Sequence, residues 1–458
     1  MGSSTSANFS GWRPGAALRA SVPGFLLVAG LLCGTGAEGQ TASVAADNPD
    51  PTPILRIETG MHSALIRRIG ADAQCRLLAT GSDDKTVRLW SMPDGKLLRT
   101  QRLPIGLGHE GKIFAIATSP DGRLVAAGGW DAALKPKNGH GIYVFDSATG
   151  TSIRRLGVLP EVINHLVFSP DGKRLAVALN SGRGIRVLDV ASGRELMSDP
   201  DFDGKSSYGL AFAADGSLFA VGFDGQLRRY GPDLKRTGRA ATSGGQQPYS
   251  VAVDPAGQRL AVGFHDTPAV EIYDATTLRR IGAADTADVS NVDFESVAWS
   301  RDGSRIFAGG TAHDQAYHRQ IRSWTRDGSR VGSDVPMSGS RIFSLEPCGD
   351  SVAFGTGDPA FGLLRPDRTA VTLGRGRTVD MRGKLGSAFT VSDDGKRVRF
   401  GLGSGAGTPV MFDLTRSVLT DAVTAPAGLV GPKTDGLTVT DWTDAAAPCG
   451  ATDRTGAV

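Results

Sequence analysis

Cysteine and charge of one sign are both scarce in this chain. Only 4 of its 458 residues are cysteine, which excludes the disulfide-dense scaffolds typical of small secreted domains. The 50 basic and 47 acidic residues leave a formal net charge of +3, so neither nucleic acid nor an anionic membrane is indicated as a partner. The longest apolar stretch is shorter than the roughly 20 residues that a membrane-spanning helix needs.

The N-terminal segment has the parts of an export signal. Arg13 and Arg19 precede the apolar stretch from Val22 to Cys33, and small residues follow it. A basic region, a short apolar region and a small-residue exit are typical of a secretory signal peptide. We therefore predict a signal peptide at 1–37, a polar linker at 38–53, and an exported protein, periplasmic or extracellular. After signal removal we expect no integral membrane domain.

Glycine is abundant, and it recurs in one pattern. The chain has 62 glycines, about twice the usual share, and the pattern is an apolar strand, an Asp-Gly type turn and a second apolar strand. The turn glycines are Gly122, Gly172, Gly216, Gly257, Gly303, Gly349 and Gly395, and Cys75 takes the same place in the first copy. Their spacing of about 45 residues is typical of one four-stranded propeller blade.

A third strand follows each copy, and a short fourth strand follows most of them. Within Val87–Trp90 and Ile185–Leu188 apolar and charged residues alternate, which is the period of a β-strand. Eight such units predict an all-β fold: a β-propeller of seven or eight four-stranded antiparallel blades over 54–420. A C-terminal strand and tail are expected at 421–458. A lone strand at 54–59 could close the ring, so the repeat count fits either number.

The first unit resembles a WD40 repeat. It carries Gly60-Met61-His62 and then a Thr-Gly-Ser-Asp-Asp run ending in a strand with Trp90. In that family a His, a Ser or Thr, an Asp and a Trp form a hydrogen-bonded tetrad that holds a blade together. The resemblance gives this structural role to His62, Thr80, Asp84 and Trp90. It is strong in the first unit and degenerate elsewhere, where most tetrads are expected to be missing.

The sequence offers little for catalysis or metal binding. It contains no Walker P-loop, HExxH or GxSxG motif, and we expect no catalytic residue and no cofactor. One weak Ca²⁺ candidate is the DxDxDG run with Asp199, Asp201 and Asp203, because Ca²⁺ takes several carboxylate oxygens. The glutamate that an EF-hand loop would place at its twelfth position is Leu210 here, so a plain acidic turn is the alternative.

The cysteines of the mature chain are expected to be mainly free thiols. Cys75 and Cys348 occupy nearly equivalent turns of different blades, which predicts a separation beyond the roughly 7 Å between Cα atoms that a disulfide spans. Cys449 lies in the tail, where a disulfide stays possible.

The leading functional hypothesis is a non-catalytic scaffold that binds a protein partner in the cell envelope. Two alternatives follow from looser resemblances, to lactonase-like and quinoprotein-like propeller enzymes and to exported bacterial proteins in which WD40 repeats precede a caspase-like peptidase domain. An Asp, His and Arg cluster within hydrogen-bond distance at the mouth of the ring would favour an enzyme. Aromatic and apolar residues there would favour a partner.

Overall fold

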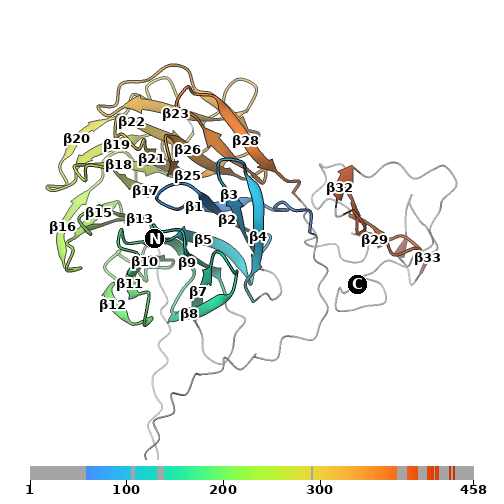
Figure 1. Ribbon diagram of the computed structural model, residues 1–458. Helices are drawn as coiled ribbons and strands as arrows, with labels where there is room; N and C mark the ends of the chain where they lie inside the picture. The colour runs from blue at the N-terminus through green and yellow to red at the C-terminus, as the bar shows by residue number, and fades with distance from the viewer. Residues whose placement is uncertain are drawn as a thin grey trace, which may run out of the picture. The chain divides into compact units, whose positions relative to one another are not determined.

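Every regular element in the described part of the chain is a β-strand. The computed structural model describes residues 58–104, 109–131, 139–289, 292–378, 389–400, 410–416, 418–421, 433–434 and 437–438. The predicted signal peptide and linker lie outside these residues. Seven consecutive four-stranded antiparallel sheets, the blades, stand in a ring (Figure 1). The predicted all-β propeller is therefore confirmed, with seven blades.

The blades use their four strands in chain order. Blade 1 comprises β1 (Ile66–Ala71), β2 (Leu77–Ser82), β3 (Thr86–Ser91) and β4 (Lys96–Arg102). Blade 2 comprises β5 (Lys112–Thr118), β6 (Leu124–Trp130), β7 (His140–Asp146) and β8 (Ser152–Leu159). Blade 3 comprises β9 (Ile163–Phe168), β10 (Arg174–Leu179), β11 (Ile185–Asp189) and β12 (Glu195–Asp199). Blade 4 comprises β13 (Ser207–Phe212), β14 (Leu218–Gly222), β15 (Gln226–Tyr230) and β16 (Arg236–Ala241).

The remaining strands continue the same order. Blade 5 comprises β17 (Pro248–Val253), β18 (Arg259–Phe264), β19 (Val270–Asp274) and β20 (Arg280–Ala283). Blade 6 comprises β21 (Ser296–Trp299), β22 (Arg305–Gly309), β23 (Arg319–Thr325) and β24 (Val335–Ser338). Blade 7 comprises β25 (Ile342–Cys348), β26 (Ser351–Thr356), β27 (Ala360–Leu364) and β28 (Ala370–Arg375). An eighth sheet comprises β29 (Phe389–Val391), β30 (Arg397–Phe400), β31 (Val410–Asp413) and β32 (Val418–Asp421), and a small hairpin comprises β33 (Lys433–Thr434) and β34 (Leu437–Thr438).

The glycine pattern has a conformational cause. All seven turn glycines predicted from the repeat have positive φ, from 60° at Gly349 to 85° at Gly216. Glycine enters this region without the penalty that a Cβ brings. Cys75, which takes the same place in blade 1, also has a positive φ of 52°. The tight turn between the first two strands of each blade therefore explains the recurring glycines.

Hydrophobic packing between blades shows that the ring closes at seven. The described residues contain seven buried clusters, one for each pair of neighbouring blades. One of them joins Ile66, Ile69 and Trp90 of blade 1 to Ala353 and Phe361 of blade 7. A sheet that is apolar on both faces needs cover on both, and the closed ring supplies it. The eighth repeat unit forms its own sheet and is not a blade of this ring.

Blade 7 meets blade 1 as consecutive blades meet each other. A Cβ on Gly355 of β26 would lie 2.9 Å from Ile69, just as one on Gly309 of β22 would lie 2.9 Å from Ile342. Glycine at this point lets the next blade's first strand approach closely. Blade 7 takes its fourth strand from its own segment, so no strand from 54–59 is needed. Glu58 and Thr59 are not in a strand, and 54–57 lie outside the described residues.

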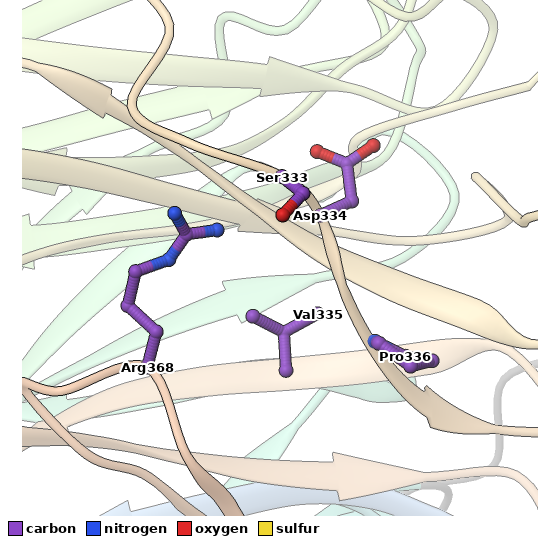
Figure 2. Close-up of a pocket in the computed structure, with 5 residues that line it drawn as sticks. All are labelled: Ser333, Asp334, Val335, Pro336 and Arg368. Atoms are coloured by element: carbon purple, nitrogen blue, oxygen red, sulfur yellow. The ribbon is translucent and has the colours of Figure 1, made fainter.

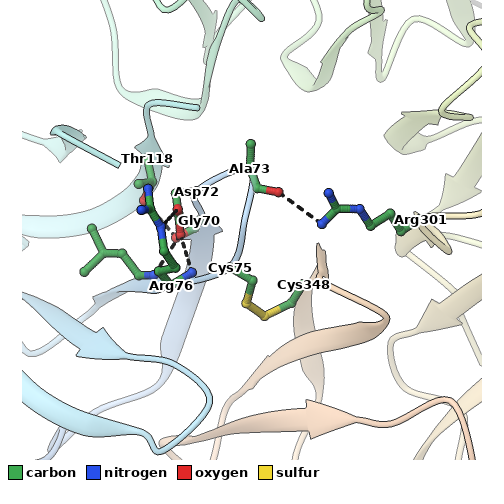
Figure 3. Close-up of a disulfide and its surroundings, with 9 residues drawn as sticks. Gly70, Asp72, Ala73, Cys75, Arg76, Thr118, Arg301 and Cys348 are labelled. Carbon is green, nitrogen blue, oxygen red and sulfur yellow. Dashed lines mark hydrogen bonds and ion pairs between the residues drawn. A yellow bond between two sulfur atoms is a disulfide. The ribbon is translucent and has the colours of Figure 1, made fainter. Parts of the chain in front are cut away.

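A disulfide crosses the same seam. Cys75 in the first turn of blade 1 is bonded to Cys348 at the end of β25, with Cα atoms 4.9 Å apart (Figure 3). The prediction that these thiols are free and too far apart was wrong. Equivalent turns are distant in most blade pairs, but blades 1 and 7 are neighbours in the closed ring. The first strands converge on the ring axis, and this brings two turns separated by 273 residues together.

Candidate functional site

A β-bulge recurs near the start of the first strand of the blades. The pairing of the first two strands shifts register there in six blades. A bulge adds one residue to a strand and redirects its side chain. The bulge residues, with the corresponding residue before β21 in blade 6, are Arg67, Phe114, Asn164, Tyr208, Tyr249, Glu295 and Phe343. We call these seven residues the axial ring; they lie where the first strands begin.

Four of the seven axial-ring residues are aromatic. Tyr208 and Tyr249 stack with their ring centroids 4.8 Å apart, and Phe223 lies 4.4 Å from Tyr208. His265 extends this row, 5.7 Å from Tyr249. These side chains are half-buried, and burial raises the pKa of Tyr249 to about 12. Tyr249 is therefore a neutral, rigid amphipathic surface at every physiological pH.

Arginine covers the other aromatic members. The guanidinium of Arg67 lies 5.1 Å from the ring centroid of Phe114 and 5.4 Å from that of Phe343. It also donates two hydrogen bonds to Asp83. Cation–π contacts of this kind fix a guanidinium over a ring face. Arg67 thus joins blades 7, 1 and 2 at one end of the axis.

An ionic cluster stands beside the aromatic row. Arg341 donates to Glu295 at 2.8 Å and to Asp293 at 3.0 Å, and His265 Nδ1 lies 2.6 Å from Glu295. Glu295 is almost fully buried, with 1% exposed. The hydrogen bond to Glu295 raises the pKa of His265. From the sequence, an Asp, His and Arg cluster at the mouth of the ring is expected for an enzyme, and aromatic residues there are expected for a protein that binds a partner. The structure contains both features.

The four predicted tetrad residues come together in blade 1. His62 Nδ1 lies 2.9 Å from Asp84, His62 Nε2 lies 2.6 Å from Thr80, and Trp90 donates to Thr80 at 2.9 Å. Burial alone would raise the pKa of Asp84, but the charge and hydrogen bond of His62 hold it well below its usual value. All four side chains are buried or nearly so. They bind β2 and β3 to the segment before β1.

Three blades, blade 1 among them, also carry a buried arginine in the third strand, which the sequence analysis did not single out. Arg88, Arg228 and Arg322 occupy the same place in the third strands of blades 1, 4 and 6, two residues before an aromatic. Arg322 pairs with Asp288 and Asp334, and Arg228 pairs with Asp224. The signal available in the sequence was an arginine two residues before an aromatic residue in each of these third strands.

The Ca²⁺ candidates are occupied by arginine. Asp199 accepts a hydrogen bond from Tyr230 at 2.7 Å and from Arg236 at 3.2 Å, while Asp201 pairs with Arg236 and Arg239. Asp203 stands in the turn with a φ of 48°. Within the described ranges no three His, Cys, Asp or Glu side chains are grouped so that they could hold a metal. Nor does any helix there have the length and apolarity to cross a membrane.

Two hollows lie away from the axis. One, of about 350 Å³, is bounded by Ser333–Pro336 before and within β24 and by Arg368 of blade 7 (Figure 2). Its Asp334 already pairs with Arg322 and Arg330. The other, of about 400 Å³, lies between the turns of blades 2 and 3. Neither gathers groups that could do chemistry, so the axial ring is the stronger candidate site.

Comparison with known proteins finds WD repeats at the start of the ring. The family described as WD domain, G-beta repeat matches residues 57–91 and 95–135, the first two repeat units. The chain is a WD40-repeat β-propeller. This propeller is 28% identical to coronin-7 of Rattus norvegicus over 216 residues, which is 45% of this chain and 22% of coronin-7.

Two further relatives are similar over comparable lengths. Eukaryotic translation initiation factor 3 subunit I of Candida albicans is 26% identical over 200 residues, 40% of this chain and 51% of that protein. Small ribosomal subunit protein RACK1y of Oryza sativa is 30% identical over 169 residues, 35% of this chain and 45% of that protein. The propeller thus spans about a fifth to a half of these relatives. They come from a mammal, a yeast and a plant, and so do not bear on the resemblance to exported bacterial proteins.

Proposed function

We propose that this propeller is a non-catalytic scaffold in the cell envelope, and that a protein partner docks on the axial ring. The single observation that carries the proposal is the half-buried aromatic row of Phe223, Tyr208, Tyr249 and His265. Tyrosine and phenylalanine offer large contact areas at low cost in side-chain entropy, and such residues are enriched where proteins bind each other. The likeness to other WD-repeat proteins supports a binding role.

The extracytoplasmic setting rests on two supports. The N-terminal segment has the composition of a signal peptide, and Cys75 is bonded to Cys348. Disulfides persist in oxidising compartments and are rare in the cytosol. Fractionation of cells that produce the tagged full chain tests this setting directly. Recovery in the envelope with the N-terminal segment removed supports it, whereas recovery in the cytosol with that segment intact contradicts it.

Site-directed photo-crosslinking in the producing cells tests the docking surface. A photo-reactive phenylalanine at Tyr208 should capture a specific protein that mass spectrometry identifies. The same group at Ile153 is the matched control, because Ile153 is 47% exposed on β8, away from the axial ring. Capture of the same proteins from both positions, or none from Tyr208, would overturn docking on the axial ring.

A propeller enzyme is the second candidate, and the ionic cluster of Arg341, Asp293, Glu295 and His265 favours it. Its charges, however, are already paired with each other: Arg341 spans both carboxylates, and His265 is held against Glu295. A general base needs a free lone pair near the working pH, and a raised pKa works against this for His265. Turnover of a lactone or sugar substrate that Glu295→Gln abolishes would establish the enzyme instead.

A further inference from the structure

In four of the seven blades, the residue that follows the axial-ring residue accepts a hydrogen bond from the next blade. In blades 5, 6 and 7 it is Ser250, Ser296 and Ser344, whose hydroxyls accept hydrogen bonds from the backbone N–H of the next blade's first strand at 3.1, 2.9 and 3.3 Å. In blade 3, His165 accepts from Leu210 in the same way. The small residues Ala115 and Gly209 take this place in blades 2 and 4.

Arg68 holds this place in blade 1, and it cannot make the link because a guanidinium has no acceptor. Its side chain instead reaches the ring axis. The guanidinium lies 5.4 Å from the ring centroid of Tyr249 in blade 5. Burial raises the pKa of Glu346 in blade 7 and the charge of Arg68 opposes this rise, while burial and then the charge of Arg68 lower the pKa of His165 in blade 3. Blades 3, 5 and 7 lie on different sides of the ring. Their residues can all lie close to the Arg68 side chain only if its guanidinium is near the ring axis.

The guanidinium has no anionic partner within the described chain. Arg68 is 5% exposed, its Nη2 is buried without a hydrogen bond, and no described side chain forms an ion pair with it. The other buried arginines of the ring are paired, for example Arg228 with Asp224. A buried charge without a hydrogen-bonded partner is costly. An anion from outside the chain would therefore gain more binding free energy beside Arg68 than beside the arginines that are already paired.

We propose that Arg68 binds a carboxylate carried by the docking partner, either an acidic side chain or the carboxylate at a chain end. This deepens the proposed function and rests on it. The planar guanidinium matches a carboxylate in two parallel hydrogen bonds, and the rings of Tyr208 and Tyr249 offer a surface for the apolar part of the partner segment. A doubly charged phosphate is disfavoured, because the nearby Arg67 and Arg341 are already paired with carboxylates.

Glu346 is the internal competitor for Arg68. It stands where the first strands of the other blades carry Gly, Ala or Val, and it is half-buried. Burial raises the pKa of Glu346 to about 7, with Arg68 acting in the opposite direction. It forms no ion pair with Arg68 shorter than 4.0 Å, so an arriving carboxylate finds the guanidinium available. Removing the Glu346 charge should strengthen binding of an external carboxylate.

Titration of the purified mature protein with benzoate, and with benzamide as its neutral isostere, tests the proposal by isothermal calorimetry or NMR. Wild type should bind benzoate at least about 10-fold more tightly than benzamide, the ratio expected for hydrogen bonds to a charged group. Arg68→Gln should abolish this preference, Arg68→Lys should keep part of it, and Glu346→Gln should increase benzoate affinity several-fold. Arg301→Gln is the matched control, since Arg301 is exposed and contacts the opposite end of blade 1 (Figure 3).

Equal binding of benzoate and benzamide by wild type, or unchanged benzoate affinity in Arg68→Gln, would overturn the proposal. Thermal unfolding of each variant shows whether it folds, and Arg68→Lys keeps the test decisive if Arg68→Gln does not. A dipeptide with a free C-terminal carboxylate is then compared with an amidated peptide that contains one Glu. Tighter binding of the first indicates a chain-end carboxylate as the ligand, and tighter binding of the second indicates an acidic side chain. If wild type does not bind benzoate but crosslinking at Tyr208 still captures a specific protein, only the carboxylate site is refuted. The reverse result would refute only the proposed docking.

Discussion

Removing the Cys75–Cys348 disulfide should weaken the propeller at one defined seam. Six of the seven seams are crossed by the chain itself, but blades 7 and 1 are joined by side-chain packing, by the hydrogen bond from Ile69 N–H to Ser344 and by this disulfide. The bond closes a loop with a sequence separation of 273 residues. In the chain-entropy treatment, a loop of this length restricts the unfolded chain by about 19 cal/mol/K, or about 5.6 kcal/mol at 25 °C.

That figure is an upper bound, because loss of a native disulfide typically costs about 2–5 kcal/mol. We expect the double variant Cys75→Ser, Cys348→Ser to lose stability within this range, measured as the shift of its guanidinium unfolding transition. Cys449→Ser is the cysteine control, because Cys449 takes no part in the Cys75–Cys348 bond. Reduction of wild type should reproduce the double variant.

Hydrogen exchange measured by mass spectrometry locates the effect. Where a seam opens locally, its amide hydrogens exchange by way of the open state, and the free energy of this opening is well below the free energy of global unfolding. In the double variant, peptides from β1 and from β25–β26 should therefore exchange faster, while peptides from blades 3 and 4 keep the wild-type rate. A loss of less than about 1 kcal/mol, or faster exchange spread evenly over all blades, would refute the reasoning that the disulfide secures this seam.

Three further predictions follow from single contacts. Gly355→Ala should cost about 1–3 kcal/mol in thermal or guanidinium unfolding, the usual price of overpacking, whereas Gly339→Ala, with nothing within 4 Å of the added Cβ, should be neutral. Asp84 has a lowered pKa, so its contribution is present above its ordinary value of 3.8 and disappears as pH falls below it; Asp84→Asn should remove this acid-sensitive component from the pH dependence of unfolding. His265 has a raised pKa, so its stabilising contact with Glu295 is complete below pH 6.5 and is lost as pH rises through the folded-state value; NMR titration should show a lower His265 pKa in Glu295→Gln.

The blade structure could be predicted because it is local. Each turn needs a residue that tolerates positive φ, and the recurrence of Asp-Gly at about 45 residues marks that need. The number of blades could not be predicted, because eight units exist in the sequence and closure depends on how one seam packs. The close contact of Gly355 with Ile66 and Ile69 is part of this seam and closes the ring at seven blades. The spacing of the repeats along the chain does not indicate that contact. The disulfide was missed for the same reason.

The axial ring could have been found from the sequence. Six of its members stand eight residues before the turn glycine or, in blade 1, before Cys75; Phe343, in a shorter turn, stands six before Gly349. Aligning the repeats on their turns would have gathered three aromatics, an arginine, an asparagine and a glutamate in one column. The reach of Arg68 could not have been predicted, because it depends on the side chains that other blades bring to the axis.

The positions where one blade departs from the others carry most of the functional information in this propeller. Similar packing in every blade explains the small residue that follows the axial-ring residue in blades 2 and 4 to 7, and the Gly, Ala or Val three residues beyond the axial-ring residue in blades 1 to 6. It does not explain Arg68 at the first of these positions or Glu346 at the second, where each places a charge near the axis. A charge that the fold does not need, and that a buried site makes costly, is best understood as serving a ligand. The asymmetry of blades 7 and 1 therefore points to the same seam that the disulfide secures, so that opening this seam should both destabilise the ring and weaken carboxylate binding.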